Sequence, residues 1–137
     1  MTEKIYEVAR KVVSGGRGDA KLAQTGEFIA PYESVLEAIK YSEEIITQSG
    51  FKPNEDFKIY IECNADDFWT SETARYEMET FKAPIEAQPL IDYYAKLMND
   101  KPSIGMLEDP LATEDVKSYS LLFEKIDREK IAINRLV

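Results

Sequence analysis

Apolar residues recur every three to four positions in four segments of the chain, which is the spacing of an amphipathic helix. The pattern predicts helices over residues 2–13, 34–49, 90–99 and 114–126. Ser34 and Glu37 have the spacing of a capping box at the start of the second helix, and Gly50 follows its end. Both boundaries of that helix are therefore marked in the sequence.

Shorter apolar and β-branched segments lie between the later helices. They predict strands over residues 58–63, 103–107 and 130–133, with a further short strand over residues 75–79. Strands that alternate with helices of this length are typical of parallel β/α packing, so we expect an α/β fold. Three main strands are too few to close an eight-stranded barrel, which takes about 250 residues. With no internal repeat and no clear linker, residues 1–137 are expected to form one domain.

The composition of the chain limits which partners it can bind and in which compartment we expect it. The chain has 26 acidic and 17 basic residues and a formal net charge of −9, which disfavours binding to nucleic acid or to anionic lipid. No apolar run reaches the ~20 residues of a membrane-spanning helix, and the first residues carry no apolar export signal. The single cysteine, Cys63, excludes an internal disulfide and fits a reducing compartment, so we expect a cytoplasmic location.

Two carboxylates stand at the ends of predicted strands, where parallel β/α folds collect functional side chains. Glu62 lies near the end of the first main strand and Glu108 lies just after the second. Carboxylates that converge there would suit a hard cation such as magnesium. Acidic residues at strand ends also occur as solvated side chains or helix caps, and the spacing alone leaves both readings open.

Other chemistries have less support. The chain contains no histidine, so a nucleophile paired with histidine is excluded within it, and zinc would have one cysteine and no imidazole. The glycine cluster at residues 15–18 does not follow a strand and does not match a phosphate-binding loop. No basic residue stands beside Cys63 to activate its thiol, which favours a small buried residue.

Several motifs, in order along the chain, resemble the enolase family. Residues 90–98 (LIDYYAKLM), 101–104 (KPSI) and 107–110 (LEDP) are similar to the family's "LIDYYKKL", "YPI" and "IEDP". Residues 75–82, 58–65 and 29–31 are similar to its "KYDLDFK", "KIGLDCAAS" and "FAPN". The resemblance runs from about Ile29 to Ile133, and its most specific part is the Glu-Asp-Pro motif. It implies part of a TIM barrel of enolase type.

The resemblance also implies a reaction and a metal. Enolases remove water from 2-phosphoglycerate with magnesium held by three carboxylates at successive strand ends. Glu108 matches one ligand, and Glu62 replaces an aspartate, which moves its oxygens by about 1.5 Å. Asn134 and Arg135 stand where the family has paired aspartates, so the third ligand is reduced to an amide beside a cation.

The acid–base residues implied by the resemblance are altered too. The family's "GDEGG" loop supplies a catalytic glutamate, whereas residues 24–28 read QTGEF. Gly26 falls on the glutamate position, and Glu27 could serve only with a shift of one residue, which catalytic geometry tolerates poorly. The family's general-base lysine and phosphate-binding residues would fall after Val137, and its N-terminal domain before Met1.

Three functions remain as hypotheses. The leading one is a non-catalytic, enolase-like binding or structural module that has a protein partner or self-associates, because partial barrels expose strand edges and apolar faces. The second is a fragment of an active magnesium-dependent enolase, a phosphopyruvate hydratase (a lyase) with a phosphorylated small molecule as substrate. The third is a cation-binding module without turnover.

Overall fold

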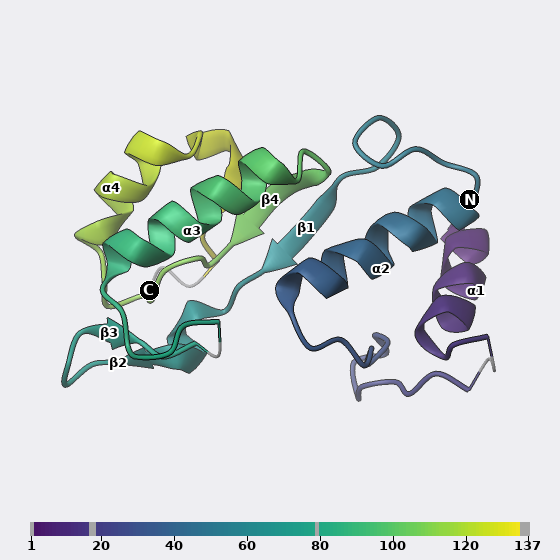
Figure 1. Cartoon of the computed structure of the whole chain (residues 1–137), viewed down its shortest axis with the longest axis horizontal. Helices are drawn as coiled ribbons and strands as arrows, with labels where there is room; N and C mark the ends of the chain where they lie inside the picture. The colour runs from purple at the N-terminus through teal and green to yellow at the C-terminus, as the bar shows by residue number, and fades with distance from the viewer. Residues whose placement is uncertain (1, 17–18, 79, 135–137) are drawn as a thin grey trace. The chain divides into compact units, whose positions relative to one another are not determined.

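In the computed structural model, residues 2–16, 19–78 and 80–134 are described. The chain divides into two units, Met1–Phe57 and Lys58–Val137, and each is described by itself (Figure 1). The expectation of one domain over residues 1–137 stays a prediction. No helix in the described ranges is long and apolar enough to cross a membrane.

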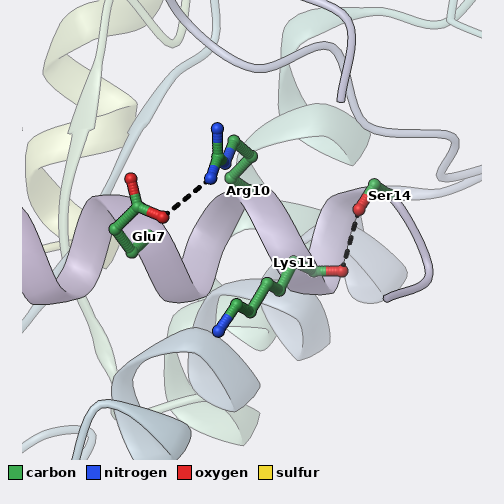
Figure 2. Close-up of polar contacts among 4 residues, drawn as sticks. All are labelled: Glu7, Arg10, Lys11 and Ser14. Atoms are coloured by element: carbon green, nitrogen blue, oxygen red, sulfur yellow. Dashed lines mark hydrogen bonds and ion pairs between the residues drawn. The ribbon is translucent and has the colours of Figure 1, made fainter. Parts of the chain in front are cut away.

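The first unit begins with helix α1, Thr2–Val13, at the bounds that the apolar pattern predicts. On its surface the Arg10 guanidinium lies 2.9 Å from the Glu7 carboxylate, as Figure 2 shows. An exposed ion pair of this kind stabilises a helix by less than about 1 kcal/mol. The Ser14 hydroxyl donates to the Lys11 carbonyl oxygen at 3.2 Å. The Gly16 backbone N–H donates to the same oxygen at 2.7 Å, so this carbonyl near the helix end has partners from beyond the helix.

Helix α2, Val35–Gln48, confirms the predicted start and stop signals. The Ser34 hydroxyl accepts from the backbone N–H of Glu37 at 3.2 Å, as an N-cap residue does. The Glu37 carboxylate reaches back to the backbone N–H of Glu33 at 2.8 Å. At the other end Gly50 has a φ of +85°, which a residue with a side chain adopts only at a cost.

The second unit contains a parallel sheet of three strands, in the order β1-β4-β5. Its strands are β1 (Ile59–Glu62), β4 (Ile104–Glu108) and β5 (Ile131–Ala132). In chain order, helix α3 (Ala87–Asp100) directly precedes β4, and helix α4 (Ser118–Lys125) follows β4 and precedes β5. Figure 1 labels both helices and β4. Strands that follow one another in the chain are neighbours in the sheet, as in a β/α barrel. The predicted α/β fold with parallel strands is confirmed.

A register shift early in β1 decides which side chains of β4 are buried. Ile104 and Leu107 are both buried although they stand three positions apart, which a regular two-residue alternation would not allow. The shift inserts one extra residue of β4 at Gly105. A Cβ at Gly105 would lie 2.7 Å from the β carbon of Lys58, so glycine permits this close approach.

The core of the second unit joins α3, α4 and β4. Helices α3 and α4 pack against each other. The buried apolar side chains are Leu90, Ile91, Tyr94 and Leu97 of α3, Ile104 and Leu107 of β4, Leu122 of α4, and Ala65, Tyr76, Leu111, Ala112 and Ile126 from other parts of the unit. Their burial on the helical side of the sheet is the main stabilising contribution of this unit.

Two helix starts differ from the sequence prediction. Helix α3 begins at Ala87 rather than at residue 90, because Pro89 sits in the first turn, where its missing N–H has no intrahelical partner to lose. Helix α4 begins at Ser118 rather than at residue 114. Asp115, within the predicted helix, instead accepts hydrogen bonds from the hydroxyls of Ser118 and Tyr76, which holds residues 114–117 in turns.

Smaller elements complete the second unit. Strands β2 (Trp69–Thr70) and β3 (Arg75–Tyr76) pair in antiparallel fashion, so the short predicted strand at residues 75–79 is present but brief, and its partner had no sequence signal. The 3₁₀ helices η1 (Ala65–Phe68) and η2 (Arg128–Lys130) follow β1 and precede β5.

Candidate functional site

Glu62 and Glu108 are the last residues of two neighbouring strands. They are register partners in the parallel pair β1·β4, so their side chains leave the same face of the sheet. Adjacent strands lie about 4.8 Å apart, a spacing at which two carboxylates at strand ends can bind the same small cation. Glu62 is exposed and Glu108 is half-buried. The structure thus brings these two predicted site residues together.

Strand β5 has no acidic residue in register with Glu62 and Glu108. Ala132 is the register partner of Glu108, and Asn134 follows two positions later with an exposed side chain. In the described ranges no three or more histidine, cysteine, aspartate or glutamate side chains form a group that could hold a metal. The three residues predicted for the site therefore offer two carboxylates and one carboxamide. These oxygens fit magnesium chemically, with one negative charge fewer than three carboxylates would supply.

Asp109 connects the three strand ends. Its backbone N–H donates to the Ala132 carbonyl oxygen at 2.9 Å, and its own carbonyl oxygen accepts from the N–H of Ala65 at 3.1 Å. Its carboxylate accepts from the backbone N–H of Asn134 at 2.8 Å. Asp109 is 5% exposed and has a φ of +46°, a left-handed conformation that aspartate tolerates better than most residues.

The loops that follow β1 and β4 are also joined to each other. The Asp66 carboxylate accepts from both the backbone N–H and the hydroxyl of Thr113, each at 2.8 Å. The buried Tyr76 hydroxyl donates to Asp115 at 2.9 Å and accepts from the backbone N–H of Ala112 at 3.1 Å. Burial, as the largest cause, raises the pKa of Tyr76 above its usual range, so the phenol stays protonated and able to donate.

Sequence reasoning missed these connecting residues. Asp66 and Thr113 are 47 positions apart, and Tyr76 and Asp115 are 39 apart, so no local pattern relates them. For Asp109 a partial signal was available, because it stands between a strand-end glutamate and a proline. That context suggests a turn but names none of its hydrogen-bond partners.

Cys63 follows Glu62 and is a free, half-buried thiol. Burial, with smaller contributions from the nearby carboxylates, raises the pKa of Cys63 to about 12. The reactive thiolate is therefore scarce at neutral pH. The raised pKa favours the small, unreactive residue that the sequence predicts.

Alkylation of Cys63 is expected to be about a thousandfold slower in the folded chain than in the unfolded chain at pH 8, because the raised pKa leaves so little thiolate. Iodoacetamide labelling followed by mass spectrometry, with and without denaturant, measures both rates. The chain has one cysteine, so the unfolded sample is its own control. Similar rates in the two states would contradict the burial of this thiol.

Glu27 lies in the first unit, in a turn closed by a hydrogen bond from the Ala23 N–H to the Glu27 carbonyl oxygen at 2.9 Å. Gly26, at the position of the family's catalytic glutamate, has a φ of +97°, which the turn requires and which favours glycine. The Thr25 hydroxyl donates to the Glu27 carboxylate and holds its pKa below the usual value. An exposed, readily ionised carboxylate is a poor proton donor at neutral pH.

The proposed site residues thus fall into two groups. Glu62, Glu108 and Asn134 lie at the carboxyl edge of the second unit, whereas Glu27 lies in the first. Each group is described by itself. Metal binding by the first group and proton transfer by Glu27 stay predictions.

Comparison with known proteins covers nearly the whole chain. The family model "Enolase, C-terminal TIM barrel domain" matches residues 1–135. The chain is 30% identical over 129 residues to the enolase of Lactobacillus helveticus and to enolase 1 of Lactobacillus gasseri, and 29% identical to the enolase of Lactobacillus acidophilus. Each match covers 94% of this chain and 29% of the relative, so the chain spans less than a third of their length.

Proposed function

The chain belongs to the enolase C-terminal TIM barrel domain family, and from this membership we propose that it is an enolase-like binding or structural module without dehydratase activity of its own. The observation that carries the proposal is the composition of the strand-end group. Two glutamates are in register, and a neutral carboxamide, Asn134, stands in the third place. With a glycine-dependent turn at the position of the catalytic glutamate, neither the metal site nor the acid–base pair of an enolase is complete.

A weak divalent-cation site is part of this proposal. Glu62 and Glu108 would hold magnesium through their carboxylate oxygens, and Asn134 would add an amide oxygen. When bound, magnesium would draw these side chains together and neutralise their charge. Because the site has two carboxylates, we expect a dissociation constant of about a millimolar, as for weak oxygen-ligand sites.

We also propose that a protein partner, or a second copy of the chain, binds the sheet face that carries Tyr60 and Met106. Tyr60 is on that face and is 68% exposed, and Met106, its register partner, is half-buried. An exposed aromatic next to an apolar side chain on a sheet favours coverage by another protein surface. A cytoplasmic location, expected from the single cysteine, belongs to the same proposal.

A second candidate function is that of a piece of an active magnesium-dependent enolase, which converts 2-phosphoglycerate to phosphoenolpyruvate. The register of Glu62 with Glu108 favours it, because two carboxylates on neighbouring strand ends could share one magnesium ion. The carboxamide of Asn134 opposes it, since it removes one charge from that site.

Magnesium titration by calorimetry, followed by an absorbance assay for phosphoenolpyruvate formed from 2-phosphoglycerate, tests the non-catalytic proposal for this chain. We expect weak magnesium binding and no product. Glu108→Gln should abolish the binding, whereas Glu124→Gln, which alters an exposed glutamate on α4, should leave it unchanged. Product that disappears in Glu108→Gln would overturn the non-catalytic proposal and support the enolase fragment.

A further inference from the structure

Asp109 stands next to a proposed ligand, yet its carboxylate is directed elsewhere. The side chain is buried, and one of its oxygens accepts the backbone N–H of Asn134 at 2.8 Å. A hydrogen bond from an amide to an ionised carboxylate is shorter and stronger than a neutral one. This oxygen of the carboxylate is therefore bonded to the protein backbone.

The hydrogen bond extends the sheet beyond its last regular pair. The β4·β5 ladder ends where Glu108 pairs with Ala132, and the Asp109 N–H still donates to the Ala132 carbonyl oxygen at 2.9 Å. Asn134 lies two residues further on, after the strand has ended. Its backbone is held to β4 by the Asp109 carboxylate. Beyond the last backbone pair of β4 and β5, the Asp109 carboxylate therefore provides a hydrogen bond to residue 134, the proposed third ligand.

Asp109 also contacts the opposite neighbour. Its carbonyl oxygen accepts from the N–H of Ala65 at 3.1 Å, and the carbonyl oxygen of Glu108 accepts from the N–H of Cys63 at 2.8 Å. Through one residue the chain after β1 and the chain after β5 are both tied to the end of β4. The left-handed φ of +46° is what allows a single residue to bond on both sides as the strand ends.

We infer that Asp109 is a positioning residue, whose carboxylate fixes Asn134, and with it the third ligand position, relative to Glu62 and Glu108. The effect of Asp109 on cation binding depends on the proposed function. Its effect on the position of Asn134 does not. Asp109 contacts no cation in this role. Asp109 acts through its hydrogen bond with the backbone N–H of Asn134. An oxygen acceptor at position 109 is therefore more important for this role than the negative charge of the carboxylate.

Two variants of the full chain separate the acceptor from the charge and from the backbone conformation. Asp109→Asn removes the charge but keeps an oxygen acceptor, and asparagine also tolerates a positive φ. Asp109→Gly removes both charge and acceptor while relieving the left-handed conformation. Both variants are neutral at position 109, but only Asp109→Asn keeps a side-chain oxygen that can accept a hydrogen bond.

Amide hydrogen exchange measured by NMR reads the positioning directly. In Asp109→Gly we expect exchange at the Asn134 amide to be at least about tenfold faster than in Asp109→Asn. The Lys101 amide at the end of α3 donates to the Leu97 carbonyl oxygen at 2.9 Å; it should exchange equally in both variants and controls for changes away from Asn134. Equal exchange at Asn134 in the two variants would overturn the inference. So would a wild-type Asn134 amide that exchanges at the rate of an unfolded chain, a measurement that needs neither variant.

Magnesium titration of the same variants tests the consequence for the site. We expect Asp109→Gly to bind magnesium several-fold more weakly than Asp109→Asn, which a purely electrostatic role for Asp109 would not produce. If wild type and both variants bind no magnesium, the proposed cation site fails. The exchange ratio at Asn134 then still supports or overturns the positioning role by itself.

Discussion

Leu107→Ala is expected to lower the free energy of unfolding by about 2–5 kcal/mol. Leu107 is fully buried in the central strand of the sheet, between its register partners Ile61 and Ile131. Truncation removes apolar contacts and leaves a cavity that the neighbouring strands cannot close without breaking their register. The loss would be a large part of the stability of a domain of this size.

Urea denaturation of the full chain, followed by circular dichroism, measures the effect of Leu107→Ala. Val116→Ala is the matched control, because Val116 is 65% exposed and its truncation should change the free energy of unfolding by no more than about 0.5 kcal/mol. If the two variants were equally stable, Leu107 would not be at the centre of the core described above.

Asn134→Asp is expected to strengthen magnesium binding by about 10- to 100-fold. The substitution adds a third carboxylate to Glu62 and Glu108. Two unit charges 4 Å apart attract by about 4 kcal/mol at an effective dielectric constant of 20. Repulsion among the three carboxylates offsets part of this gain, and each remaining 1.4 kcal/mol corresponds to a tenfold change in affinity.

Calorimetric titration with magnesium compares Asn134→Asp with a control of the same charge. Asn99→Asp places a new carboxylate on the exposed surface of α3, where it changes the net charge equally. We expect Asn99→Asp to shift the affinity by less than threefold, because exposed charges far from a site are screened by salt. Equal gains from both variants would mean that position 134 does not belong to the cation site.

The α/β class and most element positions were predictable from local pattern. The apolar periodicity located α1 at its observed bounds, and the Ser34–Glu37 pair together with Gly50 marked both ends of α2. These features depend on residues within a few positions of each other, so the sequence carries them directly. The enolase resemblance, based mainly on the Glu-Asp-Pro motif, agrees with the family model over residues 1–135.

The sequence prediction differs from the structure where contacts between distant residues outweigh the local conformational preference of a segment. Residues 114–117 have a helical pattern, but Asp115 bonds to the Tyr76 hydroxyl, and the helix starts only at Ser118. Strand β2 has no strand pattern of its own and forms because β3 pairs with it. In both places a partner many positions away determines the backbone conformation.

The candidate site divides in the same way. The available donors can be read from the residues alone: two glutamates at predicted strand ends, an asparagine at the position of the family's third ligand, and no histidine. The register of Glu62 with Glu108, and the hydrogen bond from the Asn134 N–H to the Asp109 carboxylate, become visible only in the folded chain. Residue type is a local property, whereas register and hydrogen bonding between strands depend on how segments 25 or more positions apart come together.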